Sequence, residues 1–457
     1  MPAFDAIVIG TGQAGPTLAH RLAGSGMRVA VIERHLFGGT CVNTGCTPTK
    51  TLVASAYAAR LAHRADEYGV AIDGDISIDM KKVKARKDYV LGFSRRGVEQ
   101  GLRDNPKITV YQGHGRFAAP DRVTVGSETL SAPKIFLNVG ARASIPPIPG
   151  LDQVPYLTNS GLLDLEVVPQ HLIIVGGSYI GLEFAQVFRR FGSKVSIIET
   201  APRLIVREDA DVSAAIADIL GREGIALYLG ANDLKFAKRG TEIIASLKAE
   251  AGAAEIVGSH LLIATGRRPN TDDLGLDQAG VATDAKGYIG VNDRLETSVP
   301  GIWALGDCNG RGAFTHTAYN DNDIVAGNLI DGEVRRVSDR IVAYNLYIDP
   351  PLGRIGMTEA EVRKSGRPAL MATRPMENVS RAFEKGETLG FMKILVDAES
   401  RQVLGASILG VGGDEVIHVL LTLMYAKAPY EVMQRAVFIH PTVSELLPTM
   451  LGSLKPL

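Results

Sequence analysis

The feature that most constrains the fold is a glycine-rich loop near the N-terminus, set between a predicted strand and a predicted helix. Residues 5–9 read as a buried strand, residues 10–15 are GTGQAG, and residues 16–23 have the apolar periodicity of a helix. A second predicted strand, residues 28–32, ends at Glu33. Strand, glycine loop, helix, strand and acid in this order predict a dinucleotide site.

The glycines of this loop have separate physical tasks. One permits a tight turn, one lets the backbone approach a pyrophosphate, and one allows the helix to pack close to the strand. The helix N-terminus offers free N–H groups and the positive end of its dipole to the phosphates. An acid at the end of the second strand accepts hydrogen bonds from ribose hydroxyls. The predicted ligands of this dinucleotide are Gly10, Gly12, Gly15 and Glu33.

The same pattern occurs a second time in the middle of the chain. A predicted strand at residues 171–175 leads into GGSYIG at 176–181, in which Ser178 replaces the middle glycine. The next predicted strand, residues 194–198, is followed by an acid. Two such units predict two bound dinucleotides. The predicted ligands of the second one are Gly176, Gly181 and Glu199.

The end of this second unit bears on the choice of nicotinamide cofactor. Glu199 favours an unmodified ribose 2′-hydroxyl and hence NADH. Arg203 and Arg207 follow soon after and could instead meet a 2′-phosphate. We therefore expect NADH in preference to NADPH, with NADPH kept as the alternative.

Charge and hydropathy argue against several kinds of partner. Lys and Arg number 49 and Asp and Glu 50, a formal charge of -1, which gives no electrostatic reason to expect nucleic acid or an anionic membrane. No apolar run approaches the roughly 20 residues that span a bilayer. The first ten residues lack the basic region of a signal peptide. We therefore expect a cytoplasmic protein without nucleic-acid or membrane partners.

A cysteine pair lies in the segment GGTCVNTGCTPTK, residues 38–50. Cys41 and Cys46 would lie too far apart for a relaxed disulfide within one regular helix. The glycines and Pro48 allow a distorted or just-starting helix, which can bring the Cα atoms within the required range of roughly 4.4–6.8 Å. Half a zinc site would need further Cys or His ligands, and none follow at ligand spacing. We expect a redox-active pair and no metal site.

Five segments, taken in order, make the chain resemble the pyridine nucleotide–disulfide oxidoreductase family over essentially its full length. This family includes dihydrolipoamide dehydrogenase, glutathione reductase and mercuric reductase. The loop at 10–15 resembles its FAD site, GGTCVNTGCTPTK its redox-disulfide motif, and GGSYIGLE its NAD(P) motif. TSVPGIWALGD at 297–307 resembles the second FAD contact and HPTVSE at 440–445 the acid–base motif. The resemblance implies FAD, together with NADH or NADPH, as cofactors.

The resemblance also implies roles for single residues. Cys46 is expected to lie next to the flavin as a thiolate, and Cys41 to exchange with the substrate. Lys50 is expected near flavin N5, paired with Glu183, since a buried lysine needs a partner to stay charged. Tyr179 is expected to cover the nicotinamide pocket until the cofactor arrives. Further expected cofactor contacts are Gly39, Thr40, Gly140, Gly266 and Asp307.

His440 and Glu445 are the expected acid–base pair. Thiol–disulfide exchange needs one thiol deprotonated and the leaving thiol protonated, and a histidine can do both when a carboxylate fixes its tautomer. Family members place this histidine against the disulfide of the partner subunit. The resemblance therefore implies an obligate homodimer with shared active sites.

The expected fold class is α/β, with two Rossmann-like dinucleotide-binding domains, for FAD and NAD(P), plus a C-terminal α+β dimerisation domain. A proline cluster at 145–149 marks the end of the first segment. The expected segments are 1–150 for FAD, 151–266 for NAD(P), 267–336 for the second part of the FAD or central domain, and 337–457 for dimerisation.

The electron acceptor is left open among several candidates. CTPTK differs from the usual IPSK ending of the lipoamide enzymes, and Glu199 argues against the NADPH preference of glutathione reductases. CTPTK is most similar to proteins labelled mercuric reductase, yet the chain ends without their vicinal cysteines and carries the His-Pro-Thr element that they lack. We expect a disulfide or related oxidised small molecule, with Hg(II) or another metal ion, or lipoamide, as alternatives. A flavin oxidase or diaphorase, or a redox sensor, is the alternative from another class.

Two further positions are notable. Cys308 has no partner in the sequence and is expected to be structural. Asn138 stands in a segment where the family usually has Ala-Thr-Gly, and we expect a small change near the FAD with no loss of binding.

Overall fold

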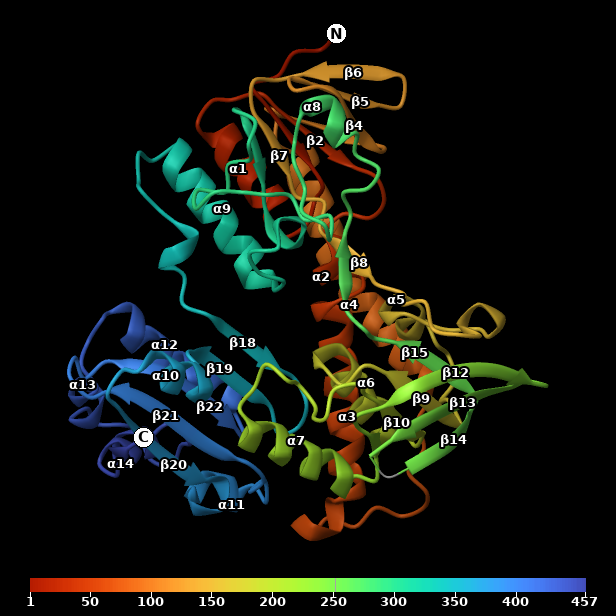
Figure 1. Ribbon diagram of the computed structural model, residues 1–457, viewed down its shortest axis with the longest axis vertical. Helices are drawn as coiled ribbons and strands as arrows, with labels where there is room; N and C mark the ends of the chain where they lie inside the picture. The colour runs from red at the N-terminus through yellow and green to blue at the C-terminus, as the bar shows by residue number, and fades with distance from the viewer. Residues whose placement is uncertain (251) are drawn as a thin grey trace.

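The computed structural model describes residues 1–250 and 252–457, and Figure 1 shows three principal sheets with long helices between them. The first sheet is parallel, and its middle strand is buried at every residue because AIVI has apolar side chains on both faces. The chain returns to this sheet near residue 302, after the second nucleotide unit. Its strand order is β17 (Ile302–Ala304), β7 (Ile135–Leu137), β1 (Ala6–Ile9), β2 (Val29–Glu33) and β3 (Ile108–Gln112).

Helices and a small antiparallel sheet cover this parallel sheet. The helix α1 (Gly15–Gly24) contacts α9 (Thr315–Leu329), so two segments far apart in the sequence meet on one face. The antiparallel sheet consists of β4 (Gly115–Ala119), β5 (Arg122–Val125) and β6 (Glu128–Ser131).

The second principal sheet repeats the design of the first. It is parallel, with helices α6 (Tyr179–Arg190) and α7 (Ala210–Arg222). A second antiparallel sheet follows, formed by β12 (Asn232–Arg239), β13 (Glu242–Ala249) and β14 (Gly252–Gly258). The parallel strands, in spatial order, are β11 (Ala226–Tyr228), β10 (Lys194–Ile198), β9 (His171–Val175) and β15 (His260–Ile263).

Two kinds of element connect the two nucleotide units. β8 (Ala141–Ala143) pairs with β16 (Arg267–Pro269) where the chain leaves the first unit and returns to it. α3 (Cys46–His63) packs against both α4 (Met80–Arg103) and α6, and Figure 1 shows it passing down the centre of the molecule. Three short helices complete these units, α2 (Gly39–Asn43), α5 (Asn159–Leu163) and α8 (Leu276–Ala279).

The third principal sheet is antiparallel and lies in the C-terminal part. Its strand order is β18 (Ala343–Leu346), β19 (Leu352–Gly356), β22 (Val403–Leu409), β21 (Phe391–Asp397), β20 (Ala369–Pro375) and β23 (Lys455–Pro456). Its helices are α10 (Glu359–Ser365), α11 (Ser380–Glu384), α12 (Gly413–Tyr425), α13 (Glu431–Gln434) and α14 (Leu446–Leu451).

A buried lysine fastens this C-terminal sheet to the second nucleotide unit. Lys393 of β21 lies 3.0 Å from Asp209 and 2.8 Å from Asp211 at the start of α7, and 3.1 Å from Glu359 of α10. Burial lowers the pKa of Lys393, but the hydrogen bonds that it donates to Asp211 and Asp209 outweigh this effect and raise the pKa. Within the described part of the chain, no helix is both long enough and apolar enough to cross a bilayer.

Candidate active site

A cavity of about 1060 Å³ runs between the two nucleotide units and reaches the C-terminal sheet. Its wall includes residues from widely separated segments, among them Gly10, Cys46, Tyr179, Asp307 and His418. The predicted site residues on its wall are Gly10, Gly12, Glu33, Gly39, Thr40, Cys41, Cys46, Lys50, Gly140, Tyr179, Glu183 and Asp307. Those outside its wall are Gly15, Gly176, Gly181, Glu199, Gly266, His440 and Glu445.

The first glycine loop is shaped by contacts that exclude side chains. Gly10 has φ +99°, and a Cβ there would lie 2.3 Å from the Asn138 carbonyl oxygen. A Cβ on Gly15 would lie 2.3 Å from the Gly10 carbonyl oxygen, so the helix can pack against the strand only without a side chain. Glu33 accepts hydrogen bonds from the backbone N–H of Thr11 at 3.0 Å and its hydroxyl at 2.6 Å. These contacts therefore fix a loop backbone that a dinucleotide can approach closely.

The second glycine loop has the same construction. Gly176 has φ +115°, and a Cβ on Gly181 would lie 2.0 Å from the Gly176 carbonyl oxygen. Glu199 accepts hydrogen bonds from the N–H of Gly177 at 2.7 Å and of Ala201 at 2.8 Å. The helix α6 begins at Tyr179, which places its N-terminus directly after the loop, where a phosphate would bind.

The two cysteines lie on either side of a break in the helix. Cys41 belongs to α2, which ends at Asn43, and Cys46 is the first residue of α3. Asn159 donates a hydrogen bond to the Thr44 carbonyl oxygen at 2.7 Å and so fixes the break. The sequence prediction of a distorted or just-starting helix agrees with this geometry. Both cysteines are free thiols in the structure.

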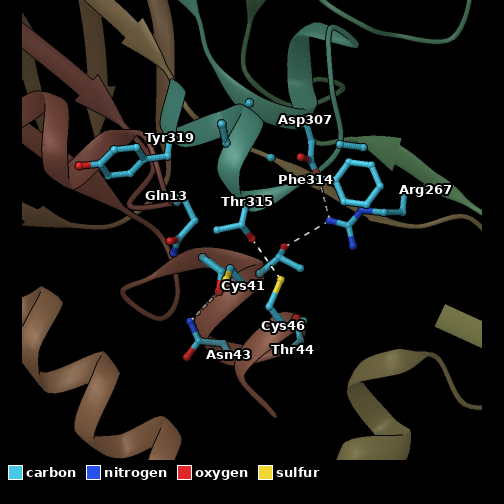
Figure 2. A pocket seen from close by; sticks show the side chains of 18 of the residues that line it. Gln13, Cys41, Asn43, Thr44, Cys46, Arg267, Asp307, Phe314, Thr315 and Tyr319 are labelled. Atoms are coloured by element: carbon cyan, nitrogen blue, oxygen red, sulfur yellow. Dashed lines mark hydrogen bonds and ion pairs between the residues drawn. The ribbon is translucent and has the colours of Figure 1, made fainter. Parts of the chain in front are cut away.

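The two thiols differ strongly in acidity. The pKa of Cys46 is lowered to about 6, chiefly by a hydrogen bond from Cys41 and also by Thr315 and Lys50, against the opposing effect of burial. The pKa of Cys41 is raised, chiefly because its proton is held by the Cys46 sulfur. The Thr315 hydroxyl lies 3.1 Å from that sulfur, as Figure 2 shows. The pair therefore holds one proton at neutral pH and carries one thiolate.

A half-buried ion pair lies next to the cysteines. Lys50 Nζ is 2.7 Å from Glu183 Oε2 and 2.9 Å from Oε1, so the expected Lys50–Glu183 contact is present. The Tyr347 backbone N–H donates to the same carboxylate at 3.0 Å, and the lysine ammonium lies 4.6 Å from the Tyr347 ring centre. These contacts hold a positive charge beside the thiols while leaving it partly exposed to the cavity.

Asp307 and Arg267 form a second ion pair on the cavity wall. Their charged groups are 3.2 Å apart, and burial raises the pKa of Asp307 against the attraction of Arg267. The guanidinium of Arg267 also donates a hydrogen bond to the Thr40 hydroxyl at 3.3 Å. Sequence reasoning did not single out Arg267, although it follows the buried strand at residues 260–263 by only a few positions.

Asn138 has a structural task that the sequence did not reveal. Its side-chain oxygen accepts a hydrogen bond from the Gly15 N–H at 2.9 Å, and its side-chain nitrogen donates to the Leu305 carbonyl oxygen at 3.0 Å. It therefore ties the first glycine loop to the end of β17. Cys308 is fully buried, and burial raises the pKa of its thiol to about 12.

His440 and Glu445 form the expected pair but lie away from the thiols. His440 Nδ1 is 2.9 Å from Glu445 Oε2, and the imidazole side chain is 73% exposed. The pair lies between α13 and α14, which Figure 1 places at the far side of the C-terminal part from α2. The fold therefore brings Cys41, Cys46, Lys50 and Glu183 together and leaves the histidine pair on the surface.

Comparisons with known proteins agree with this geometry. The family model described as pyridine nucleotide-disulphide oxidoreductase matches residues 4–321, and that of its dimerisation domain matches residues 342–451. The probable pyridine nucleotide-disulfide oxidoreductase RclA of Escherichia coli (strain K12) is 37% identical over 464 residues, which is 100% of both chains. Dihydrolipoyl dehydrogenase of Chlamydia muridarum and mercuric reductase of Streptomyces lividans are each 32% identical over 97% of this chain and 95% and 94% of their own.

A solved structure gives the same result. It is described as the Cu(II) complex of the HOCl-induced flavoprotein disulfide reductase RclA from Escherichia coli. It matches with a TM-score of 0.90 and 36% identity over 100% of both chains. The chain belongs to the pyridine nucleotide-disulphide oxidoreductase family. It is a flavoprotein oxidoreductase that uses FAD and NAD(P)H, which confirms the predicted fold class and cofactors, and its dimerisation domain indicates a homodimer.

Proposed function

We propose that the chain is a disulfide reductase that passes electrons from NADH, by way of FAD, through Cys41 and Cys46. The observation that carries the proposal is the pair itself. Two free thiols lie on the cavity wall, and one of them has its pKa lowered to about 6. The thiolate is the form that exchanges with disulfides, whereas an unperturbed thiol is mostly protonated at pH 7.

The wall of the cavity beside the first glycine loop fits FAD. A Cβ on Gly12 would lie 2.8 Å from Asn138 Oδ1, and one on Gly39 would lie 2.7 Å from the Gly12 Cα. Because these positions carry no side chain, their backbone can approach a pyrophosphate closely. Among the residues the structure describes, the buried Nε of Arg267 has no hydrogen-bond partner. That N–H is therefore available to an acceptor atom of the cofactor. When bound, FAD supplies the chemistry that takes a hydride from NADH and delivers two electrons to a disulfide.

The residues around the pair then have distinct tasks. The positive charge of Lys50, held in place by Glu183, stabilises the thiolate of Cys46. Cys41 loses its proton and attacks one sulfur of the acceptor disulfide, which forms a mixed disulfide and releases the other sulfur as a thiolate. Cys46 then attacks the Cys41 sulfur, which restores the Cys41–Cys46 disulfide and releases the second half of the acceptor.

We place the proton transfer on the partner subunit's His440. Within its own chain this histidine is largely exposed and stands outside the cavity wall. Val437 and Ile439 beside it are 99% and 80% exposed, so they form an apolar surface that a second copy would cover. Glu445 fixes the imidazole, which can take the proton of Cys41 and return it to the departing thiolate.

The second nucleotide loop favours NADH. Glu199 presents a carboxylate where the adenosine ribose would bind, and this arrangement suits a free 2′-hydroxyl. Arg203 donates to the carbonyl oxygens of Val206 and Glu208, both at 3.2 Å, so its guanidinium is engaged by its own loop.

A thiophilic metal ion is the second candidate acceptor. One observation favours it, since the RclA structure that this chain matches was solved as a Cu(II) complex. Soft metal ions bind thiolates, and the two thiols face the cavity. An acceptor screen with both nicotinamides separates the candidates, using lipoamide, glutathione disulfide, Cu²⁺, Hg²⁺ and quinones.

Anaerobic titration of the purified protein with NADH tests the electron path. We expect a long-wavelength absorption band after two electrons, together with two titratable thiols. Cys46→Ser should lose the band and the disulfide reductase activity while its flavin is still reduced. Full disulfide turnover by Cys46→Ser would contradict the proposal, because electrons would then bypass the pair.

A further inference from the structure

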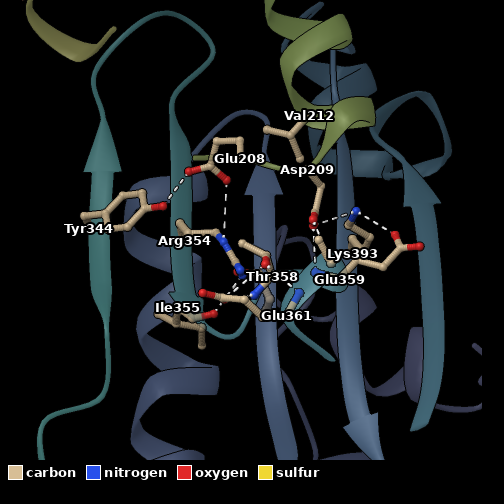
Figure 3. Close-up of polar contacts among 12 residues, drawn as sticks. Glu208, Asp209, Val212, Tyr344, Arg354, Ile355, Thr358, Glu359, Glu361 and Lys393 are labelled. Atoms are coloured by element: carbon tan, nitrogen blue, oxygen red, sulfur yellow. Dashed lines mark hydrogen bonds and ion pairs between the residues drawn. The ribbon is translucent and has the colours of Figure 1, made fainter. Parts of the chain in front are cut away.

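A buried carboxylate outside the thiol site makes contact with the predicted nicotinamide cover. Glu208 lies in the loop between β10 and α7, and its side chain is fully inaccessible. Its Oε1 accepts a hydrogen bond from the Tyr344 hydroxyl at 2.6 Å and from the Tyr179 hydroxyl at 3.4 Å. Figure 3 shows Glu208 between Tyr344 of β18 and Arg354 of β19. The carboxylate thus connects the second nucleotide unit to the C-terminal sheet.

Arg354 holds this carboxylate in place. Its own side chain is 1% exposed, and its Nε lies 3.5 Å from Glu208 Oε2. A second guanidinium nitrogen donates to the carbonyl oxygens of Ile355 at 2.9 Å and Ala406 at 3.0 Å, which fixes the guanidinium to the sheet. Burial raises the pKa of Glu208, while Tyr344 and Arg354 oppose the rise. Buried groups of opposite charge stabilise each other, so Glu208 and Arg354 form a built ion pair, in which Glu208 Oε2 and Arg354 Nε have no hydrogen-bond partner among the described residues.

Tyr179, the first residue of α6, is contacted by Phe314, Tyr344 and Glu208. Its ring stands edge-on to Phe314 at 5.9 Å and to Tyr344 at 5.6 Å between ring centres. Its hydroxyl donates a long 3.4 Å hydrogen bond to Glu208 and also interacts with the Tyr344 hydroxyl. Tyr344 makes the short bond to the same oxygen, so Glu208 stays anchored when Tyr179 leaves. A weak bond to a fixed acceptor can hold a ring and still release it.

We propose that Glu208, anchored by Tyr344 and Arg354, is a positioning residue that latches Tyr179 in its closed position and thereby limits nicotinamide binding. The inference rests on the proposed function, with NADH as the electron donor, and on the role expected of Tyr179 as the cover of the nicotinamide pocket. An incoming nicotinamide must displace the ring and break the bond to Glu208. The apparent affinity is reduced by the fraction of molecules in which the ring is closed, so weakening the latch tightens binding.

Tyr179→Phe tests the latch because it keeps the ring and removes only the hydroxyl. We expect the Kd of NAD⁺ for the oxidised holoenzyme, measured by calorimetry, to fall roughly threefold to tenfold, the equivalent of one modest hydrogen bond. Once the flavin has been reduced, oxygen should also reoxidise it faster in this variant, because the Tyr179 ring leaves the pocket open more often. A merely structural role for the hydroxyl would have the opposite sign, since a damaged site binds NAD⁺ more weakly.

A double-mutant cycle assigns the effect to Glu208. Glu208→Gln should also lower the Kd, and Tyr179→Phe should change it less in that background than in the wild type, because both changes weaken the same bond. Tyr57→Phe is the matched control. It removes a 2.5 Å hydrogen bond from a tyrosine to Glu387, away from the cavity wall, and should leave the Kd unchanged.

The outcomes distinguish a failure of the proposed function from a failure of the proposed contact between Glu208 and Tyr179. If NADH fails to reduce the flavin of the wild type, the proposed function is wrong. If NADH reduces the wild type but Tyr179→Phe binds NAD⁺ no more tightly, or if Tyr57→Phe shifts the Kd equally, the latch is wrong. Should Glu208→Gln fail to fold, the comparison of Tyr179→Phe with Tyr57→Phe still decides.

Discussion

Replacing Thr315 by valine should raise the pKa of Cys46 and so move the pH at which the reduced pair carries its thiolate. The Thr315 hydroxyl lies 3.1 Å from the Cys46 sulfur and comes from a segment 269 residues away, the first residue of α9. Valine has nearly the same shape and cannot donate a hydrogen bond. The substitution therefore removes one stabilising contact with the thiolate and leaves the helix N-terminus in place.

The size of the effect follows from the value of a hydrogen bond to a charged group. Such a bond contributes roughly 1.5–3 kcal/mol, and one pKa unit corresponds to about 1.4 kcal/mol, so the shift is about one to two units. The pKa of Cys46 is about 6 in the wild type. In the variant it should lie at roughly 7–8. At pH 7 the thiolate fraction then falls from roughly nine tenths to between one half and one tenth.

The assay is the long-wavelength band of the two-electron-reduced protein, recorded anaerobically against pH. The band needs the thiolate, so it is present above the pKa and is lost as the pH falls through it. Its midpoint should move upward in Thr315→Val and stay in place in Thr315→Ser, which keeps the hydroxyl. Because the two thiols share a proton, the midpoint belongs to the pair rather than to one sulfur. An unchanged midpoint in Thr315→Val would refute the role of the hydroxyl.

Three further predictions follow from other contacts. Glu199→Ala should lower kcat/KM for NADH relative to NADPH by roughly tenfold, because a carboxylate that suits a free ribose hydroxyl is lost, and steady-state kinetics with both cofactors check this. His440→Gln should slow reoxidation by a disulfide at least roughly a hundredfold while reduction by NADH is unchanged, since it removes only proton transfer; stopped-flow measurement of the two half-reactions separates them. Lys393→Met should lower the free energy of unfolding by roughly 3–5 kcal/mol, because it leaves three carboxylates without their shared cation, and denaturant unfolding of the holoenzyme measures the loss.

The glycine loops were predictable because their cause is local. At Gly10 and Gly176 the backbone turns with positive φ, and a Cβ at Gly15 or Gly181 would collide with a carbonyl oxygen five residues earlier. A sequence of glycines between a strand and a helix reports these constraints directly. The break between the cysteines is local too, since α2 ends and α3 begins within the segment that contains both.

Contacts between distant segments could not be derived in the same way. Thr315 reaches Cys46, and Tyr344 reaches Glu208 from 136 residues away, only after the three sheets have packed together. No spacing in the sequence signals such a contact. The Lys50–Glu183 pair, 133 residues apart, was found only because the chain resembles a known family. The proposed division at residues 150, 266 and 336 stays a prediction.

The opposite pKa shifts of the two cysteines also explain why a second subunit would be needed. Cys41 donates a hydrogen bond to the Cys46 sulfur, so the same contact that makes Cys46 a thiolate makes Cys41 a poor nucleophile. Lys50 also lowers the pKa of Cys41, but that pKa stays raised despite it. Attack on an acceptor therefore requires a base that takes the proton of Cys41, and on the proposed mechanism the exposed His440 of the partner subunit is that base. On the proposed mechanism, one chain is sufficient for reduction of its flavin by NADH, whereas electron transfer from the thiols to an acceptor disulfide requires both chains of the dimer.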